Sequence, residues 1–371
     1  MDREPVVPDY GSSTVADVLP AVAAHLGVPG FDADPLDLPD ARRHVVFLVD
    51  GLGWENLLGA LPSLSALADL MDRVDPITAG VPSTTTTSIA ALGLGVPPGV
   101  HGLVGYRFFD PDLGFCMAPL KWDERVDPAA YQPLPSVLER AQADGVAVTR
   151  VVPTDHVASG LSAAVLRGPG VGVDEEDEAA WLAETVRAAR QGDRSLVYTY
   201  DRHLDHAGHA HGAGSERWLE AAVALDGRVG RLRDALDPDT VLVVTADHGM
   251  VDVPADRRLK IEKTPDLAAD LAQVGGEARF RHLHTARPQA VAARWRDVLG
   301  DRAWVERKDD AVAAGWFGPV GERARRRLGD VVVAARGDWA FLSRRTPFEA
   351  KLVGMHGSLT RREMVVPLFA A

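Results

Sequence analysis

The sequence has little or none of several features that define whole classes of protein. Cys116 is its only cysteine, which excludes an intrachain disulfide and a cysteine-based zinc finger. No uninterrupted apolar stretch approaches the ~18 residues of a membrane span, and the first residues lack the basic and apolar segments of a secretory signal. We therefore expect a soluble, cytoplasmic protein without a membrane partner.

An excess of basic charge is also missing. The chain carries 40 Lys and Arg residues against 53 Asp and Glu residues, for a formal net charge of −13. Because proteins that bind nucleic acid generally neutralise its phosphates with a basic face, we expect no stable nucleic-acid partner. A small phosphate-ester substrate is compatible with this charge, since a bound metal ion can supply positive charge locally.

What the sequence does contain is an alternation of apolar runs with amphipathic segments. The apolar runs predict strands at residues 44–50, 146–152, 195–201 and 240–247. The amphipathic segments predict helices at residues 135–144, 174–190 and 215–236. Near-continuous apolar strands between helices indicate an α/β fold, in which a mostly parallel central sheet is flanked by helices on both faces.

The texture of the sequence divides the chain into three parts. Residues 1–43, rich in Pro and Asp, are expected to form an N-terminal arm with one short helix. Residues 44–250 and 351–371 are expected to form the catalytic α/β core. Residues 251–350 are Arg-rich and of mixed pattern, and they predict a smaller α+β insertion.

Arginines are frequent in the predicted insertion. They either line the entrance to a site, where they would recognise a phosphate or carboxylate, or cover a solvated surface, which is the interpretation we favour. The arginines concerned are Arg257, Arg258, Arg279, Arg281 and Arg287.

Acidic residues follow three of the predicted strands: Asp50 after the first, Asp205 after the third, and Asp247 with His248 after the fourth. In an open parallel sheet, functional groups collect at the carboxyl ends of the strands. Asp205 and His209 are four residues apart, so on a helical turn they would share a face and could bind one ion. The glycine before His209 is expected to let the backbone turn tightly beside that ion. Imidazole and carboxylate ligands suit Zn²⁺, with Mn²⁺ or Fe as alternatives.

Two further segments carry candidate residues. His356 lies between two glycines just before the last apolar run and is a third candidate ligand. Four consecutive threonines, residues 84–87, precede an apolar helical pattern. They are either a capping sequence or a hydroxyl nucleophile at a helix N-terminus, where free N–H groups stabilise a phosphoryl group. Because coordination to Zn²⁺ would lower the pKa of such a hydroxyl, the threonine and metal signals support each other.

Five short motifs, in this order along the chain, resemble the alkaline phosphatase superfamily, and most closely its nucleotide pyrophosphatase/phosphodiesterase branch. The motifs are Asp50-Gly-Leu, Pro82-Ser83-Thr84-Thr85, Asp205-x-x-Gly-His209, Thr245-Ala-Asp247-His248-Gly249 and His356-Gly357. The resemblance extends over residues 44–368, and its specificity comes from the order of all five motifs.

This resemblance implies two zinc ions at the carboxyl edge of the central sheet. The implied ligands of one ion are Asp50, Asp247 and His248, with Thr85 alongside. The implied ligands of the other ion are Asp205, His209 and His356. Two divalent ions against three carboxylates leave the site about neutral once the threonine hydroxyl is ionised, so that it attracts an anionic phosphoryl group.

The implied activity is zinc-dependent hydrolysis of phosphodiester or nucleotide pyrophosphate bonds through a covalent phospho-threonine intermediate. Thr85 is assigned as the nucleophile because the family places that residue third after Pro82. Tyr106 occupies the approximate position of a family asparagine that contacts a phosphate oxygen, so Tyr106 is assigned to substrate binding. Alternatives are a phosphomonoesterase or phosphonate hydrolase with the same metal site, or a non-catalytic metal-binding protein.

Overall fold

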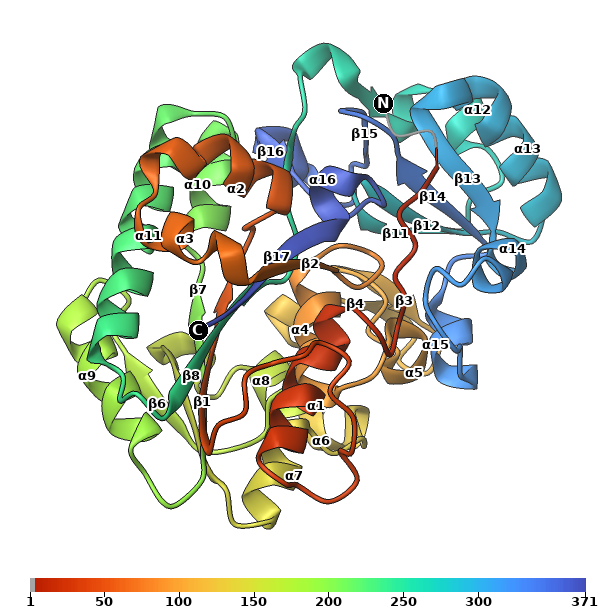
Figure 1. Ribbon diagram of the computed structural model, residues 1–371. Coiled ribbons are helices and arrows are strands. Elements are labelled where there is room, and N and C mark those ends of the chain that lie inside the picture. The colour runs from red at the N-terminus through yellow and green to blue at the C-terminus, as the bar shows by residue number, and fades with distance from the viewer. Residues whose placement is uncertain (1–3) are drawn as a thin grey trace.

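Seven strands form a central sheet in the computed structural model, which describes residues 4–371 (Figure 1). From one edge to the other, the strands are β2 (Val74–Thr78), β17 (Val365–Ala370), β8 (Thr240–Ala246), β1 (Arg43–Val49), β7 (Ser195–Asp201), β5 (Ala147–Pro153) and β6 (Gly170–Val173). The strands from β8 to β6 run parallel, whereas β17 pairs antiparallel with both β2 and β8. The expected mostly parallel α/β fold is confirmed.

Helices cover both faces of this sheet (Figure 1). On one face α9 (Glu178–Ala189) contacts β1, β5 and β7, and α11 (Glu216–Ala235) packs against α9. On the other face lie α1 (Val15–His25), α4 (Thr85–Leu94) and α7 (Val137–Ala143). The arm predicted for residues 1–43 begins with three residues outside the described part of the chain, and its helix α1 packs against α4.

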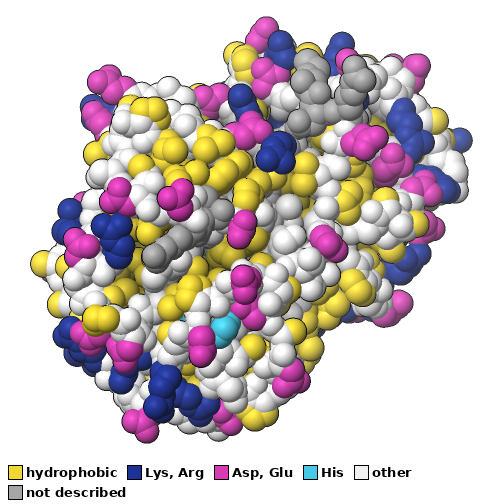
Figure 2. Space-filling view, in the orientation of Figure 1, with side chains coloured by type: hydrophobic (Ala, Val, Ile, Leu, Met, Phe, Trp, Pro, Cys, Tyr) yellow, Lys and Arg dark blue, Asp and Glu magenta, His cyan; other side chains and the backbone are white. Residues whose placement is uncertain are grey.

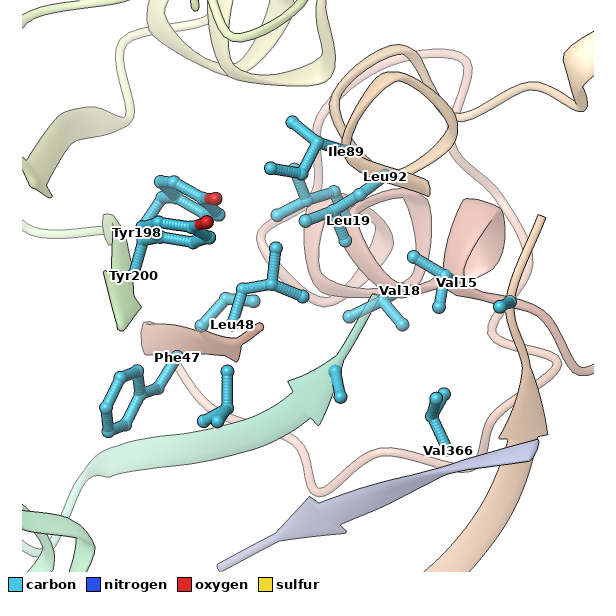
Figure 3. Close-up of a cluster of buried hydrophobic side chains, with 14 of the residues drawn as sticks. Val15, Val18, Leu19, Phe47, Leu48, Ile89, Leu92, Tyr198, Tyr200 and Val366 are labelled. Atoms are coloured by element: carbon cyan, nitrogen blue, oxygen red, sulfur yellow. The ribbon is translucent and has the colours of Figure 1, made fainter. Parts of the chain in front are cut away.

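The central strand β1 explains why the sheet is buried on both sides. Figure 3 shows Phe47 and Leu48 on opposite sides of β1, with Leu48 directed toward Leu19 and Ile89. Phe47 packs against the ring of Trp181 in α9, with a centroid separation of 5.3 Å. Successive side chains of a strand alternate in direction, so a strand covered on both faces reads as a near-continuous apolar run, as residues 45–49 of β1 do.

A second, antiparallel sheet lies beside the central one (Figure 1). Its strands, in spatial order, are β11 (Gln273–Glu277), β12 (Phe280–His284), β14 (Val331–Ala335) and β13 (Ala303–Arg307). Helix α13 (Pro288–Leu299) packs against β13 and β14, with Trp295 in a separate hydrophobic cluster. The division into a core and an inserted subdomain at residues 251–350 stays a prediction.

Two arginines at and just before β12 correct one expectation from the sequence. Arg279 and Arg281 were expected on a solvated surface or at a site entrance, but their exposed fractions are 0% and 1%. Arg279 makes a bidentate ion pair with Glu363, at 2.9 and 2.6 Å. Arg281 pairs with Glu349 and also donates to the carbonyl of Phe341 at 2.8 Å. The prediction was wrong because acidic partners far along the chain compensate both buried cations.

The remaining elements are short and mostly connect these layers. The helices are α2 (Trp54–Ala60), α3 (Ala66–Asp69), α5 (Pro98–His101), α6 (Pro128–Tyr131), α8 (Gly160–Val165), α10 (His203–His211), α12 (Pro265–Ala268), α14 (Lys308–Ala313), α15 (Glu322–Arg327) and α16 (Arg361–Met364). The strands are β3 (Phe108–Asp110), β4 (Phe115–Met117), β9 (Val251–Asp252), β10 (Arg258–Lys260), β15 (Ala340–Leu342) and β16 (Gly354–Met355).

The visible surface is of mixed charge. Figure 2 shows acidic and basic side chains interspersed over one face of the molecule, between patches of apolar side chains. Among the described residues, no helix combines the length and the apolar character that crossing a membrane would require.

Candidate metal centre and active site

The first group of candidate ligands lies at the carboxyl ends of two adjacent strands. Asp50 follows β1, and Asp247 and His248 follow β8, which pairs with β1 in parallel. The Nε2 atom of His248 is 3.3 Å from Asp50 Oδ1 and 3.6 Å from Asp247 Oδ2. All three residues are buried, and one ligand atom from each lies within 4.8 Å of the others. The structure therefore brings these three predicted residues together.

The second group lies beside the first and uses helix α10, which follows β7. Asp205 and His209 are one turn apart on this helix, and Asp205 Oδ1 is 3.4 Å from His209 Nε2. His356 comes from the loop after β16, with its Nε2 atom 4.0 Å from the same oxygen. His248 also faces this group, because its ring stacks on that of His356 at 3.6 Å and both lie with Asp205 within 4.8 Å.

Backbone carbonyls fix the orientation of all three candidate histidines. The Nδ1 atom of His209 is 2.8 Å from the carbonyl of Gly354. Those of His248 and His356 are 3.1 and 3.0 Å from the carbonyls of Gly249 and Ser83. Because a carbonyl only accepts, each Nδ1 carries the hydrogen, and the Nε2 lone pairs are free to bind a metal.

Buried carboxylate oxygens without hydrogen-bond partners indicate that the two groups of candidate ligands are suited to bind a cation. Asp50 Oδ1, Asp205 Oδ1 and Asp247 Oδ2 have no hydrogen-bond partner among the described residues. Burial raises the pKa of Asp50 well above its usual value, and the charges of Asp247 and Asp205 raise it further. Burial is also the main cause that raises the pKa of Asp247. Such oxygens, together with imidazole nitrogens, fit a divalent transition-metal ion.

Thr85 is the first residue of α4 and lies against the first group of ligands. Its Oγ1 atom is 3.2 Å from His248 Nε2, and its exposed fraction is 7%. The neighbouring threonines are also buried. This contradicts the capping interpretation of the sequence, in which one threonine caps the helix and the others are solvated. Thr84 is the N-cap residue but makes no side-chain capping bond, and Thr87 donates to the carbonyl of Leu103.

The glycine before His209 has a different role from the one expected. Gly208 lies inside α10 and does not turn the backbone. A Cβ atom there would come within 2.3 Å of the sulfur of Met250. A Cβ at Gly354 would in turn approach the Gly208 carbonyl to 2.6 Å. The glycine therefore allows β16 to pack closely against the helix that carries Asp205 and His209.

A cavity of about 290 Å³ opens beside Thr85. Its lining includes the aromatic side chains of Trp122, His156, Tyr198 and Tyr200. Figure 3 shows the two tyrosine rings side by side on one face of β7, and the Tyr200 hydroxyl donates to Asp50. Sequence reasoning missed this cavity, although the i, i+2 spacing of the tyrosines in a predicted strand places them on one face.

Tyr106, predicted to bind substrate, lies on the other side of the site. It is half-buried, and it lines a second, smaller cavity together with His209, His356 and Glu277. Its ring is 5.6 Å from that of Phe348. Glu277 was missed by sequence reasoning, because its strand carries no pattern that indicates a functional carboxyl.

Comparison with known proteins adds to this geometry. The family described as type I phosphodiesterase / nucleotide pyrophosphatase matches residues 44–359. No curated protein matches the chain. Several solved structures resemble this chain at 17–20% sequence identity, and at such identities the likeness establishes a shared fold.

Murine ectonucleotide pyrophosphatase / phosphodiesterase 5 has 18% identity and a TM-score of 0.71, over 88% of this chain and 87% of that one. An inactive form of the same murine protein, in complex with AMP, has 17% identity and a TM-score of 0.70 over the same shares. Phosphonoacetate hydrolase from Sinorhizobium meliloti 1021, in complex with phosphonoacetate, has 20% identity and a TM-score of 0.68 over 90% of this chain and 91% of that one.

Proposed function

Because the chain belongs to the type I phosphodiesterase / nucleotide pyrophosphatase family, we propose that it is a zinc-dependent hydrolase of phosphodiester or nucleotide pyrophosphate bonds. Membership of this family supports hydrolysis of phosphoester bonds. The observation that carries the proposal is the position of the Thr85 hydroxyl, 3.2 Å from His248 Nε2 and beside buried carboxylate oxygens that have no hydrogen-bond partner among the described residues.

Two zinc ions complete the proposed site, with Mn²⁺ or Fe as alternatives for the same donors. The proposed ligands of one ion are Asp50, Asp247, His248 and Thr85. The proposed ligands of the other ion are Asp205, His209 and His356. When bound, the ions would neutralise the carboxylates and lower the pKa of the threonine hydroxyl.

The residues of the chain then have distinct tasks. Thr85 Oγ1 releases its proton to solvent water and attacks phosphorus, so an oxygen–phosphorus bond forms while the bond to the leaving oxygen breaks. The leaving oxygen takes up a proton from water. Backbone N–H groups in the first turn of α4 stabilise the phosphoryl oxygens, and Tyr106 contacts the substrate. Tyr200 holds Asp50 through its hydroxyl. Water then cleaves the phospho-threonine and restores the hydroxyl of Thr85.

The cavity beside Thr85 suits a small ester that carries an aromatic or apolar group. Its volume of about 290 Å³ and its aromatic lining, with Trp122, Tyr198 and Tyr200, would accept a planar ring. The murine structure with AMP supports a phosphate ester of this size. Arg107, which follows Tyr106, donates to the carbonyl of Arg345, so it is not placed as a phosphate clamp. This favours a diester over a monoester substrate.

The test compares hydrolysis of bis(p-nitrophenyl) phosphate and p-nitrophenyl phosphate by zinc-loaded protein, with Thr85→Ala and Thr85→Ser beside it. We expect a preference for the diester, complete loss in Thr85→Ala and residual activity in Thr85→Ser. A preference for the monoester would change the proposal to a phosphatase. Undiminished activity in Thr85→Ala would remove this residue as the nucleophile, and hydrolysis of phosphonoacetate instead of either ester would assign a phosphonate hydrolase.

A further inference from the structure

A second cavity, of about 60 Å³, adjoins the proposed active site on the side of His209 and His356. The other residues that line it are Tyr106, Glu277, Ala278, Phe348, Glu349, Leu352 and Met355. This cavity is distinct from the larger one beside Thr85, and the proposed mechanism does not use its acidic residues.

Glu277 is the feature that sets this cavity apart. It is the last residue of β11, its exposed fraction is 7%, and neither of its carboxylate oxygens has a hydrogen-bond partner among the described residues. Gly357, which follows His356 and has a φ of +128°, makes room for it, because a Cβ there would come within 2.7 Å of Glu277 Cγ. The carboxyl group therefore lies against a position that only glycine fills without strain, in the cavity that His209 and His356 also line.

Glu277 forms no recorded ion pair within residues 4–371. The other carboxyl of the cavity, Glu349, is paired with Arg281. The remaining nitrogens of Arg281 donate to the carbonyls of Phe341 and Gly276, at 2.8 and 3.2 Å. Burial raises the pKa of Glu277 to about 8. The Thr84 hydroxyl and the charge of Arg281 lower this pKa, and the charge of Glu349 raises it. A cation beside Glu277 would offset this cost.

Two aromatic rings complete the cavity wall. The rings of Tyr106 and Phe348 are 5.6 Å apart, and the faces of such rings attract cations. The ammonium group of Lys121 lies 6.0 Å from the Phe348 ring, which shows that a cation can approach this ring, and Lys121 does not line the cavity.

We propose that this cavity binds a primary ammonium group on the alcohol part of the substrate, with Glu277 as the specificity-determining residue. The inference deepens the proposed function and rests on it. A cation bound beside Glu277 favours its ionised form, whose two oxygens accept N–H donors; a primary ammonium has such donors and a quaternary ammonium lacks them. The volume of about 60 Å³ holds a compact group of this kind but not a nucleoside. The substrate class is therefore a phosphate ester of a short amino alcohol.

The test is calorimetric binding to zinc-loaded Thr85→Ala protein, which cannot turn over the ligands by the proposed route. Phosphoethanolamine is compared with propyl phosphate, in which a methyl group replaces the ammonium. We expect phosphoethanolamine to bind at least about tenfold more tightly than propyl phosphate, because a charge-assisted hydrogen bond contributes binding free energy of this size. In Thr85→Ala/Glu277→Gln this preference should disappear, while the affinity for propyl phosphate stays within twofold.

A matched control is Thr85→Ala/Glu306→Gln, in which the altered carboxyl lies on β13 and pairs with Arg296. It should keep the preference. Glu277→Gln should also fold, since a neutral amide replaces a buried and unpartnered carboxyl. Equal affinities for the two ligands, a preference that survives Glu277→Gln, or tighter binding of phosphocholine would overturn the ammonium site. Failure of propyl phosphate and of the diester bis(p-nitrophenyl) phosphate to bind would instead overturn the proposed phosphoryl site.

Discussion

Two regions of the molecule differ in how their buried charges are compensated. Where the second sheet meets the end of the chain, Arg279 and Glu363 form a bidentate pair whose exposed fractions are both 0%. At the carboxyl edge of the central sheet, Asp50, Asp205 and Asp247 lie together, each with an oxygen that lacks a partner. No lysine or arginine is recorded in an ion pair with any of these three among the described residues.

The two regions differ in whether the protein itself supplies hydrogen-bond and ion-pair partners for its buried carboxylates. Glu363 also accepts from the backbone N–H of Ser358 at 3.0 Å and from the Thr360 hydroxyl, so its oxygens are satisfied by the fold alone. The three aspartates repel one another until a cation enters. We infer that the Arg279–Glu363 pair contributes equally to the stability of the metal-free and the metal-bound protein. The aspartate cluster, in contrast, lowers stability when metal is removed and raises it when metal is bound.

The largest expected effect comes from Asp247→Asn. We expect activity to fall by about a thousandfold or more, because the variant loses a proposed ligand of the ion beside Thr85. In the metal-free protein we expect the same substitution to be stabilising. The unfolding free energy should rise by about 1–2 kcal/mol, because repulsion between residue 247 and Asp50 is relieved. Urea unfolding with and without a chelator measures both states.

Asp226→Asn is the matched control for this change. Asp226 is equally buried, but it accepts from the backbone N–H groups of Ser65, Ala66 and Leu67 at 2.9, 3.1 and 2.8 Å. Removing this charge should destabilise the protein and leave its affinity for zinc unchanged. If Asp247→Asn and Asp226→Asn shift metal-free stability in the same direction, the distinction between the two kinds of buried carboxylate fails.

The next largest effect is expected on the paired side of the comparison. Arg279→Met leaves Glu363 buried without its cation, which should cost about 3–5 kcal/mol of unfolding free energy. Because the defect is the uncompensated charge, Arg279→Met/Glu363→Gln should recover part of this loss. Urea denaturation of the two variants provides the measurement, and a cost below about 1 kcal/mol for the single variant would show that the pair is not structural.

The sequence predicted the aspartate cluster much better than the arginine pair. Asp50 and Asp247 follow apolar strands that can only be central, so their positions at one sheet edge follow from topology. The spacing of Asp205 and His209 likewise defines one face of α10. These signals are local, which is why the predicted residues meet in the structure.

The features that were missed depend on contacts between distant segments. Arg279 meets Glu363 and Glu277 reaches past Gly357 only because the second sheet packs against the end of the chain. An arginine that alternates with apolar residues in a strand has the pattern of an exposed face. Composition and periodicity do not identify its partner, so the direction of its side chain was predicted wrongly.

A smaller effect concerns pH and the neutral buried histidine of the second sheet. His282 Nε2 is 2.7 Å from the Val104 carbonyl, while Nδ1 accepts from the N–H of Gly329 at 3.2 Å. Burial lowers the pKa of His282 to about 3, and the nearby charges of His284 and Lys308 lower it further. The unfolded chain therefore binds a proton that the folded protein does not, and stability falls as pH decreases below about 6.5.

The measurement is the unfolding free energy of the wild type and of His282→Gln at pH 7 and pH 5. The stability difference between the two proteins should shrink by about 2 kcal/mol over this range, since the glutamine does not titrate. The His282→Gln variant retains two other buried histidines, His44 and His101, so it should still lose some stability as the pH falls. A constant difference between wild type and variant would contradict the neutral assignment of His282.

The smallest effect is expected where charges are paired but exposed. Arg217 and Glu220 lie on the outer face of α11, 2.8 Å apart, with side-chain exposures of 70% and 54%. Water and salt screen such a pair, so Arg217→Ala should change the unfolding free energy by less than about 0.5 kcal/mol. Urea denaturation, as for Arg279→Met, measures this change. In added salt, the difference in unfolding free energy between the wild type and Arg217→Ala should stay near zero. A cost comparable to that of Arg279→Met would mean that pairing alone, and not burial, determines what an arginine contributes in this protein.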